Sequence, residues 1–339
     1  MKLSSRALVA SVGFVISGLV LSGCAGAASN DAGSGDGASA ETITIKIATV
    51  QPSDSVDVTT LKEIAKAVAE KSDGSIELEI YDNGQIGTTA DTAAQAASGE
   101  DIITFIDAGT AASLGNPDMS ILGGPFLFED ADQAAKFAKS EVFAGMARDL
   151  AENGNLQILA MNWLDGPRHI WGNSAYPEPT DLQGLKLRTP PIESWDRTFK
   201  PLGAVTTTIE NTEAYSALEQ GVVEAAEGPI NGTYAQKWYE VAPELTLTGH
   251  FRTFLGFAIG AKTFDKLSAE QQQILMDEFV AGGDRATERY VEVEGVNLAT
   301  MEAAGVTVHK ANIAAYQDAT ADFYTDYGDL LEKVRAAGK

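Results

Sequence analysis

Residues 181–229 read DLQGLKLRTPPIESWDRTFKPLGAVTTTIENTEAYSALEQGVVEAAEGP, and their order of strand and helix signals decides the fold. A short strand is expected at 186–189, because Pro190 and Pro191 follow it and proline lacks the N–H group that a strand ladder needs. Four further elements are expected: a helix containing Trp195, a Thr-rich strand near 205–208, a helix over about 212–220 and a strand over 222–227. This alternation predicts an α/β layer, and open α/β sheets bind ligands beyond the carboxyl ends of their strands.

Arg188 stands at the carboxyl end of the first of these strands, directly before the proline break. A guanidinium presents a planar fork of N–H donors that matches a carboxylate with two parallel hydrogen bonds. Arg188 is therefore a candidate ligand for a carboxylate. A surface arginine paired with a neighbouring acidic side chain is the alternative that the local sequence leaves open.

The spacing of residues in this stretch resembles the core of the solute-binding proteins of TRAP transporters, which deliver organic acids to a membrane carrier. That family combines a D-L-x-G-x-K-x-R strand, a Leu-Gly-Ala segment, a helix with E-x-Y-x-A-L-x-x-G and a strand ending V-D-G-x-E-N-P. The resemblance extends from about residue 42 to the C-terminal helix. The matching residues are Asp181, Leu182, Gly184, Lys186, Arg188, Leu202, Gly203, Ala204, Glu213, Tyr215, Ala217, Leu218, Gly221, Glu227 and Pro229.

The resemblance implies an α/β, two-domain, periplasmic-binding-protein-like fold of class II type, with a hinge cleft and a long domain-spanning helix. Domain I is expected over 42–165 plus 254–292 and domain II over 166–253 plus 293–339. Crossings are expected near 164–166, near Thr253 and near Val291.

Three helical segments carry further expectations. Ser268 and Gln271 form a capping box that opens the long helix, and the glycine pair 282–283 is expected to interrupt and bend it. One continuous helix is expected over 131–153 and another over 311–337.

The resemblance also implies roles for individual residues. Arg188 makes the bidentate contact to a ligand carboxylate, and Arg168 supports it, with a hinge-region salt bridge as the alternative role for Arg168. Trp195 either walls the pocket or belongs to the core. Asp107 either faces the ligand or caps the segment after its strand, and capping is favoured for an Asp at a loop start.

Three positions depart from the family pattern. Gly228, after Glu227, stands where the family has an Asn that hydrogen-bonds the ligand carboxylate, so that contact is either absent or replaced, by Asn231 or by a backbone N–H group. Asn211 stands where the family has an aromatic residue against the ligand, which predicts a more polar pocket. Glu224 replaces the family's Asp. These departures leave the identity of the acid open.

The first residues of the chain resemble a lipoprotein signal. Lys2 and Arg6 precede an apolar run over 7–22 that is shorter than the about 20 residues of a spanning helix. The run ends in LSGC, which resembles a bacterial lipobox and predicts a signal peptide over 1–23 and lipidation of Cys24. An ordinary signal peptide with an incidental cysteine is the alternative. A flexible Ala, Gly and Ser linker is expected over 24–41.

Composition excludes several classes of function. The chain has 24 basic and 48 acidic side chains, so its formal net charge of −24 argues against nucleic-acid binding. Cys24 is the only cysteine, and the three histidines lack metal-ligand spacing. We therefore expect no enzyme activity, no cofactor and no metal.

The sequence thus predicts an extracytoplasmic binding protein, anchored to the outer face of the cell membrane through Cys24. Its expected partners are a small organic acid and the integral membrane subunits of a TRAP transporter. A binding protein of an ABC importer and a secreted hydrolase with paired carboxylates are the alternatives.

Overall fold

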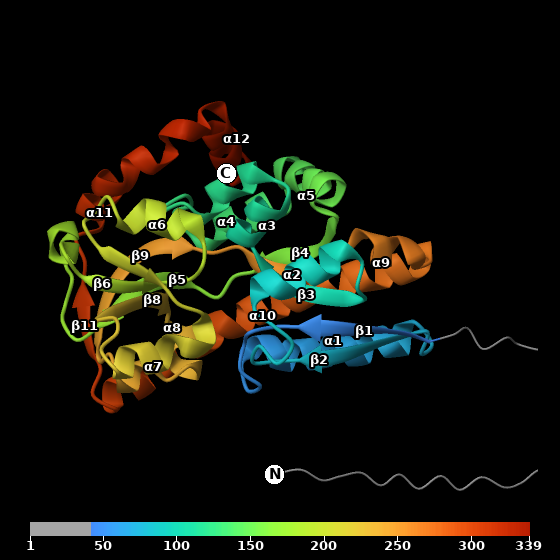
Figure 1. The fold of residues 1–339 in the computed structure, drawn as a ribbon, viewed down its shortest axis with the longest axis horizontal. Coiled ribbons are helices and arrows are strands. Elements are labelled where there is room, and N and C mark those ends of the chain that lie inside the picture. Colours follow the sequence, from blue (N-terminus) through green and yellow to red (C-terminus); the bar gives the residue numbers. More distant parts are fainter. Residues whose placement is uncertain (1–41) are drawn as a thin grey trace, which may run out of the picture. The chain divides into compact units, whose positions relative to one another are not determined.

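Two β-sheets and their covering helices make up residues 42–339, the part of the chain that this computed structural model describes (Figure 1). The predicted signal peptide, Cys24 and the linker lie outside the described residues. Within 42–339, no helix has both the length and the apolar character needed to cross a membrane.

The first sheet has the strand order β2-β1-β3-β10-β4. Its strands are β1 (Ile43–Ala48), β2 (Ile76–Tyr81), β3 (Ile102–Asp107), β4 (Leu156–Trp163) and β10 (Leu255–Gly260). Strands β2, β1 and β3 run parallel, and β10 runs antiparallel to both β3 and β4. In β2 buried Ile76 and Leu78 alternate with exposed Glu77 and Glu79, as a half-buried strand requires.

Helices from both halves of the chain accompany this sheet. They are α1 (Val56–Lys71), α2 (Thr89–Ser98), α3 (Ala108–Leu114), α4 (Ala131–Ala138), α5 (Glu141–Gly154), α9 (Ala261–Lys266) and the 35-residue α10 (Ala269–Ala303). A short 3-10 helix, η1 (Pro117–Gly123), follows α3.

The second sheet has the order β11-β9-β5-β8-β6-β7. Its strands are β5 (Pro167–Gly172), β6 (Lys186–Thr189), β7 (Val205–Thr208), β8 (Ala225–Pro229), β9 (Glu244–Arg252) and β11 (Thr307–Lys310). Strand β6 lies parallel to both β7 and β8, while β5 lies antiparallel to β8 and β9. The predicted α/β layer is therefore present, and its strand after Gly221 begins three residues later than expected, at Ala225.

Short helices connect and cover the second sheet. They are η2 (Pro179–Leu182), α6 (Glu193–Phe199), η3 (Asn211–Glu213), α7 (Ala214–Glu219), α8 (Ile230–Ala235), η4 (Trp238–Glu240), α11 (Ile313–Thr320), η5 (Ala321–Tyr327) and α12 (Asp329–Ala337). The helix expected over 212–220 is thus a 3-10 turn followed by α7.

The chain passes between the sheets at two short connections. Residues 164–166 join β4 to β5, and residues 253–254 join β9 to β10. Helix α10 packs on α1 and β4 and also contacts α8, so one helix serves both sheets (Figure 1). The predicted boundaries of the two domains fall at these connections, and the division itself stays a prediction.

Helix α10 runs without the interruption predicted at the glycine pair, so that prediction is wrong. Gly282 and Gly283 are buried, and a Cβ atom at either position would overlap a neighbour, Ile64 of α1 or Asn162 of β4. The glycines allow close packing of the helix backbone at this point.

Two predicted long helices are broken in the structure. The helix expected over 131–153 is divided into α4 and α5, because Ser140 accepts a hydrogen bond from the backbone N–H of Phe143 and starts a new helix. The helix expected over 311–337 is divided into α11, η5 and α12, and Gly328, with a φ of 48°, precedes the last of these.

Candidate functional site

A pocket lies at the ends of strands from both sheets. Its wall combines residues of β3 and the following α3, of the 164–168 connection, of the segment after β6, and of α8 and η4. The polar lining residues are Gln51, Thr89, Asp107, Thr110, Asp165, Arg168, Arg188, Glu210, Asn211, Thr233, Gln236 and Thr253. This is the position that the strand order of an α/β layer favours for a ligand.

Arg188 reaches this pocket from the carboxyl half of β6, with 2% of its surface exposed. Its Nε donates a 2.8 Å hydrogen bond to the carbonyl of Ile209, and its guanidinium lies 5.4 Å from the ring centroid of Trp238. Within residues 42–339, no acidic side chain forms an ion pair with it. Burial lowers the pKa of Arg188 to about 10, so the group stays charged at neutral pH. Arg188 is a buried cation, rather than the surface arginine that the local sequence left open.

Arg168 forms a two-pronged ion pair with Glu227. Its Nε lies 2.6 Å from Oε2 and its Nη2 lies 2.8 Å from Oε1, while Nη2 also donates to the Glu227 carbonyl at 3.2 Å. Burial alone would raise the pKa of Glu227, but the charge and hydrogen bonds of Arg168 hold it well below its usual range. Arg168 also lines the pocket. It therefore forms a salt bridge, the alternative role given above, and is still positioned beside a ligand in the pocket.

His250 lies on the other side of the same carboxylate. Its Nε2 is 3.5 Å from Oε2 of Glu227, and its Nδ1 is 2.6 Å from Oγ1 of Thr248. Burial lowers the pKa of His250 against the opposing effect of Glu227. Burial thus works against a charged imidazole, and Arg168 is the cation that holds Glu227 through two hydrogen bonds.

Trp195 belongs both to the pocket wall and to the core, the two roles that the sequence left open. It lies in α6 with 2% of its surface exposed, and its ring centroid is 4.5 Å from that of Phe251. The guanidinium of Arg168 lies 5.7 Å from the Trp195 ring centroid.

Asp107 caps helix α3, as predicted. Its Oδ1 accepts hydrogen bonds from the backbone N–H groups of Gly109 at 2.8 Å and Thr110 at 2.9 Å, and its Oδ2 accepts from the Thr110 hydroxyl. Asp107 also lines the pocket.

The structure brings Arg188, Arg168, Trp195, Asn211 and Asp107 together around one pocket. Three other predicted site residues stand behind its wall: Glu227, Gly228 and Asn231.

Asn231 is occupied elsewhere. Its Nδ2 donates to the carbonyl of Tyr290 at 3.0 Å, and its Oδ1 accepts from Asn297 at 2.9 Å. Both partners belong to α10, so Asn231 ties α8 to the long helix. Nothing in this arrangement supports Asn231 as the replacement for the family's Asn at position 228.

Sequence reasoning missed several lining residues. Asp165 is one, and burial raises its pKa to about 6 while the Thr253 hydroxyl donates to it at 3.2 Å. Glu210 directly follows Ile209, whose carbonyl holds Arg188, and burial raises its pKa. Gln236 and Trp238 lie in the QKWYE segment after α8, which gives no local signal of a site.

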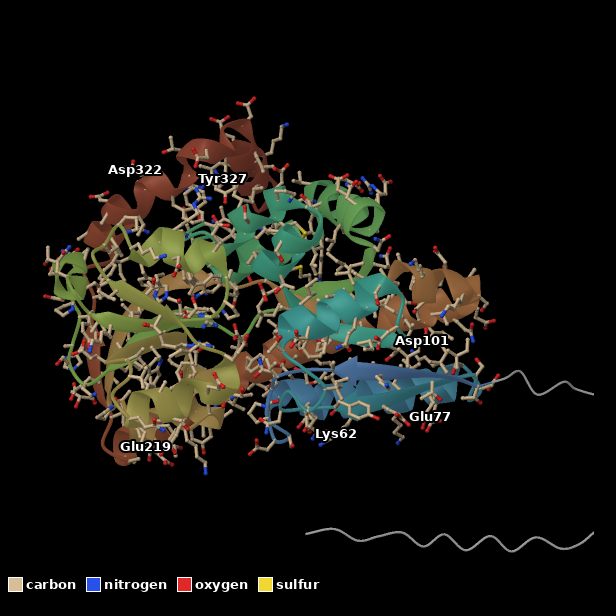
Figure 2. The ribbon with its side chains drawn as sticks, in the orientation of Figure 1. Lys62, Glu77, Asp101, Glu219, Asp322 and Tyr327 are labelled. Atoms are coloured by element: carbon tan, nitrogen blue, oxygen red, sulfur yellow. The ribbon has the colours of Figure 1, made fainter. Side chains whose placement is uncertain are left out.

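The outer surface carries many acidic side chains, in contrast to the cation in the pocket. Glu77, Glu219 and Asp322 are exposed, and Figure 2 shows them at the periphery on different elements. Exposed charges of this kind are screened by salt over about 10 Å at 0.1 M ionic strength, so the charged side chains that line the pocket act on a ligand more strongly than these surface acids do.

Comparison with known proteins agrees with this geometry. The model of the family described as bacterial extracellular solute-binding protein, family 7, matches residues 47–329. A solute-binding protein of Verminephrobacter eiseniae is 30% identical over 304 residues, covering 87% of this chain and 89% of its own.

Two solved structures of TRAP periplasmic solute-binding proteins are also similar. One, from Ochrobacterium anthropi with bound L-fuconate, has a TM-score of 0.83 at 27% identity and covers 88% of this chain and all 100% of its own. The other, from Actinobacillus succinogenes with bound L-galactonate, has a TM-score of 0.81 at 25% identity and covers 87% and 99%.

Proposed function

Because this chain belongs to the bacterial extracellular solute-binding proteins of family 7, we propose that it captures a small organic acid and delivers it to the integral membrane subunits of a TRAP transporter. Binding takes place outside the cytoplasm, where proteins of this family work. The chain acts as a carrier of its ligand and leaves it chemically unchanged.

The two arginines of the pocket provide the observation that carries this proposal. Arg168 has its charge balanced by Glu227, whereas Arg188 forms no ion pair within the described residues. A buried cation without a counter-ion is costly unless an anion joins it, and a guanidinium is matched best by a planar carboxylate. Nε of Arg188 is held by Ile209, which leaves the two Nη groups for the ligand.

The rest of the lining favours an acid that carries hydroxyl groups. Amide, carboxyl and hydroxyl groups of Gln51, Thr110, Glu210, Asn211 and Gln236 surround the pocket. Sugar hydroxyls both donate and accept hydrogen bonds, so they fit such a mixed set. L-fuconate and L-galactonate, the ligands in two similar structures, are acids of this kind. We infer a sugar acid as the ligand class.

Closure around the ligand by a hinge motion belongs to the same proposal. The two short connections, 164–166 and 253–254, and the crossing of α10 near Val291 supply the hinge. Small-angle scattering of the protein with saturating sugar acid should give a smaller radius of gyration than the free protein. An unchanged profile at saturation would contradict the hinge.

Membrane attachment through a lipidated Cys24 completes the proposal. It rests on the LSGC sequence alone.

A ligand screen followed by one substitution tests the proposed function. Melting temperatures are measured with L-fuconate, L-galactonate, D-galacturonate, D-glucuronate and sn-glycerol 3-phosphate. An acid present at 100 times its Kd should add about 2.7 kcal/mol to the free energy of unfolding. Arg188→Ala should abolish the shift, and Arg148→Ala, which removes the same charge from an exposed position on α5, should keep it. If Arg188→Ala retains the full shift, Arg188 does not bind the ligand.

A further inference from the structure

Gly228 is a glycine for reasons of space and not of backbone conformation. Its φ lies outside the left-handed region, and it forms part of the fully buried strand β8. A Cβ atom at this position would lie 3.0 Å from Cζ3 of Trp238 and 3.2 Å from Oγ1 of Thr233. Any larger side chain here would therefore compete with Trp238 for the same volume.

Trp238 fills that volume and also contacts Arg188 within the pocket wall. It is 3% exposed and lies in η4, directly after α8 and the left-handed residue Lys237. The guanidinium of Arg188 lies 5.4 Å from its ring centroid, within the range of a cation–π contact. Among the described residues, the ring of Trp238 and the carbonyl of Ile209 both hold Arg188, and the hydrogen bond to Ile209 uses Nε and not an Nη group.

The same wall carries hydrogen-bonding groups without partners. Within the described part of the chain, Oγ1 of Thr233, Nε2 of Gln236 and Nε1 of Trp238 are buried and form no hydrogen bond. All three residues line the pocket that Arg188 enters. Buried donors are nearly always paired in folded proteins, so a polar group of the ligand beside Arg188 is the partner that this wall lacks.

We propose that Trp238 occupies the space of the side chain that Gly228 lacks and that it positions Arg188 for the ligand. The wall formed by Thr233, Gln236 and Trp238 then supplies the hydrogen bond to the ligand carboxylate that a side chain at position 228 would otherwise make. The assignment rests on the proposed function of the pocket. Trp238 is thus a positioning and specificity-determining residue, one that acts on the carboxylate end of the acid.

A purely structural role for Trp238 makes different predictions. Trp238 also packs with Trp171, Val223 and Ala242 in the core of the second sheet. If packing were its only role, substitution would lower stability without altering the affinity of the folded protein. Stability would still depend on position 228, because the two residues are in contact, so affinity and the exchange of the Arg188 Nε–H are the measurements that separate the two roles.

Four variants separate these roles: Trp238→Leu, Trp238→Phe, Gly228→Asn and the double variant Gly228→Asn with Trp238→Phe. Val222→Ala, at an exposed position before the same strand, is the matched control. Affinity is measured by calorimetry with the sugar acid that gives the largest thermal shift in the screen, and unfolding free energy is measured by urea titration. Exchange of the Arg188 Nε–H is followed by NMR in the absence of ligand.

Trp238→Leu should weaken binding at least about tenfold, or about 1.4 kcal/mol, and should speed exchange of the Arg188 Nε–H. Gly228→Asn should lower both affinity and stability, because the new side chain displaces Trp238. The double variant should be more stable and bind more tightly than Gly228→Asn alone, because phenylalanine leaves room for the Asn.

Strictly additive losses in the double variant, or a Trp238→Leu protein that binds within about threefold of the parent, would overturn the assignment. If Arg188→Ala abolishes binding in that case, the proposed function still stands. If no acid of the screen binds the parent, the proposed function fails instead. The exchange rate of the Arg188 Nε–H in Trp238→Leu then decides, without a ligand, whether Trp238 positions Arg188.

Discussion

Arg168 of β5 and Glu227 of β8 are diagonal neighbours on adjacent antiparallel strands, joined by hydrogen bonds of 2.6 and 2.8 Å. The strand register pairs Ile170 with Glu227 and Arg168 with Pro229, so the two charged side chains lie on the same face of the sheet. The carboxylate is completely buried, and 12% of the arginine side chain is exposed. The ion pair therefore fixes one cation of the pocket, and in the proposed function Arg188 is the one that the ligand carboxylate neutralises.

Removing Arg168 should destabilise the protein more than it alters recognition. Arg168→Met leaves the buried Glu227 without its partner, which typically costs about 3–5 kcal/mol. The double variant Arg168→Met with Glu227→Gln removes the uncompensated charge and should recover part of that loss. Urea titration of both variants measures the difference. A double variant less stable than Arg168→Met would contradict the ion-pair role.

Arg188→Lys should bind poorly even though it keeps the positive charge. An ammonium is a point charge and cannot form the planar fork, so the loss should be at least about tenfold in affinity, or about 1.4 kcal/mol. Calorimetry with the sugar acid found in the screen measures it. Arg148→Lys on the exposed face of α5 is the matched control and should bind as the parent does. Equal affinity of parent and Arg188→Lys would show that charge alone is recognised.

Asp57 should make the protein less stable as pH rises from about 4 to about 7. Burial raises its pKa to about 7 in the folded state, opposed by a hydrogen bond from Tyr290, whereas the ordinary value is 3.8. The folded protein therefore binds the proton more tightly than the unfolded chain, and the stabilisation present below pH 4 is lost as pH rises through the folded pKa. Between about pH 4 and pH 7 the free energy of unfolding should fall by a few kcal/mol, at about 1.4 kcal/mol per unit of difference between the two pKa values.

Asp57→Asn should remove this dependence, because the amide does not titrate. The difference in unfolding free energy between pH 5 and pH 8 should be smaller in Asp57→Asn than in the parent. The control is Asp54→Asn, which changes an exposed carboxylate directly before Ser55, the N-cap residue of α1, and it should behave as the parent does. Identical pH profiles for all three proteins would rule out a titrating Asp57.

Cys24→Ser should prevent membrane attachment. Lipidation requires the thiol of this cysteine, because the serine hydroxyl does not replace it. Without the lipid, the proposed anchor is lost. Fractionation of cells that produce the two proteins should place the parent with the membrane and the variant in the soluble extracytoplasmic fraction or unprocessed. A variant that remains processed and membrane-bound would refute the lipoprotein assignment.

Local sequence signals were sufficient where the physical cause is local. The strand of Arg188 was predicted because two prolines end it, and the cap at Asp107 because a short carboxylate at a strand end reaches the next backbone N–H groups. The succession of strands β6, β7 and β8 along the chain, with helices between them, follows from the same short-range pattern.

Features that depend on residues distant in the sequence were missed or predicted wrongly. Glu227 lies 59 residues from Arg168, and only the β5–β8 register brings the two together. The contact of Trp238 with Arg188 joins residues of different elements, and no motif marks it. Gly282 and Gly283 looked like a helix interruption, because sequence does not show which neighbour approaches a helix.

Those two glycines have a mechanical consequence. They let the backbone of α10 lie close to Ile64 and Asn162, and Arg289 further along the helix donates to Thr60 and Glu63 of α1, so this part of α10 is held against α1. From Gly283 to Ala303 the helix continues for about 30 Å, at about 1.5 Å per residue. In the proposed closure α10 tilts at the crossing near Val291, and over the about 18 Å of helix that follow, at about 1.5 Å per residue, a tilt of about 10° would move the far end by about 3 Å. The tilt is passed on to α8, because Asn231 accepts a hydrogen bond from Asn297, which lies beyond that crossing.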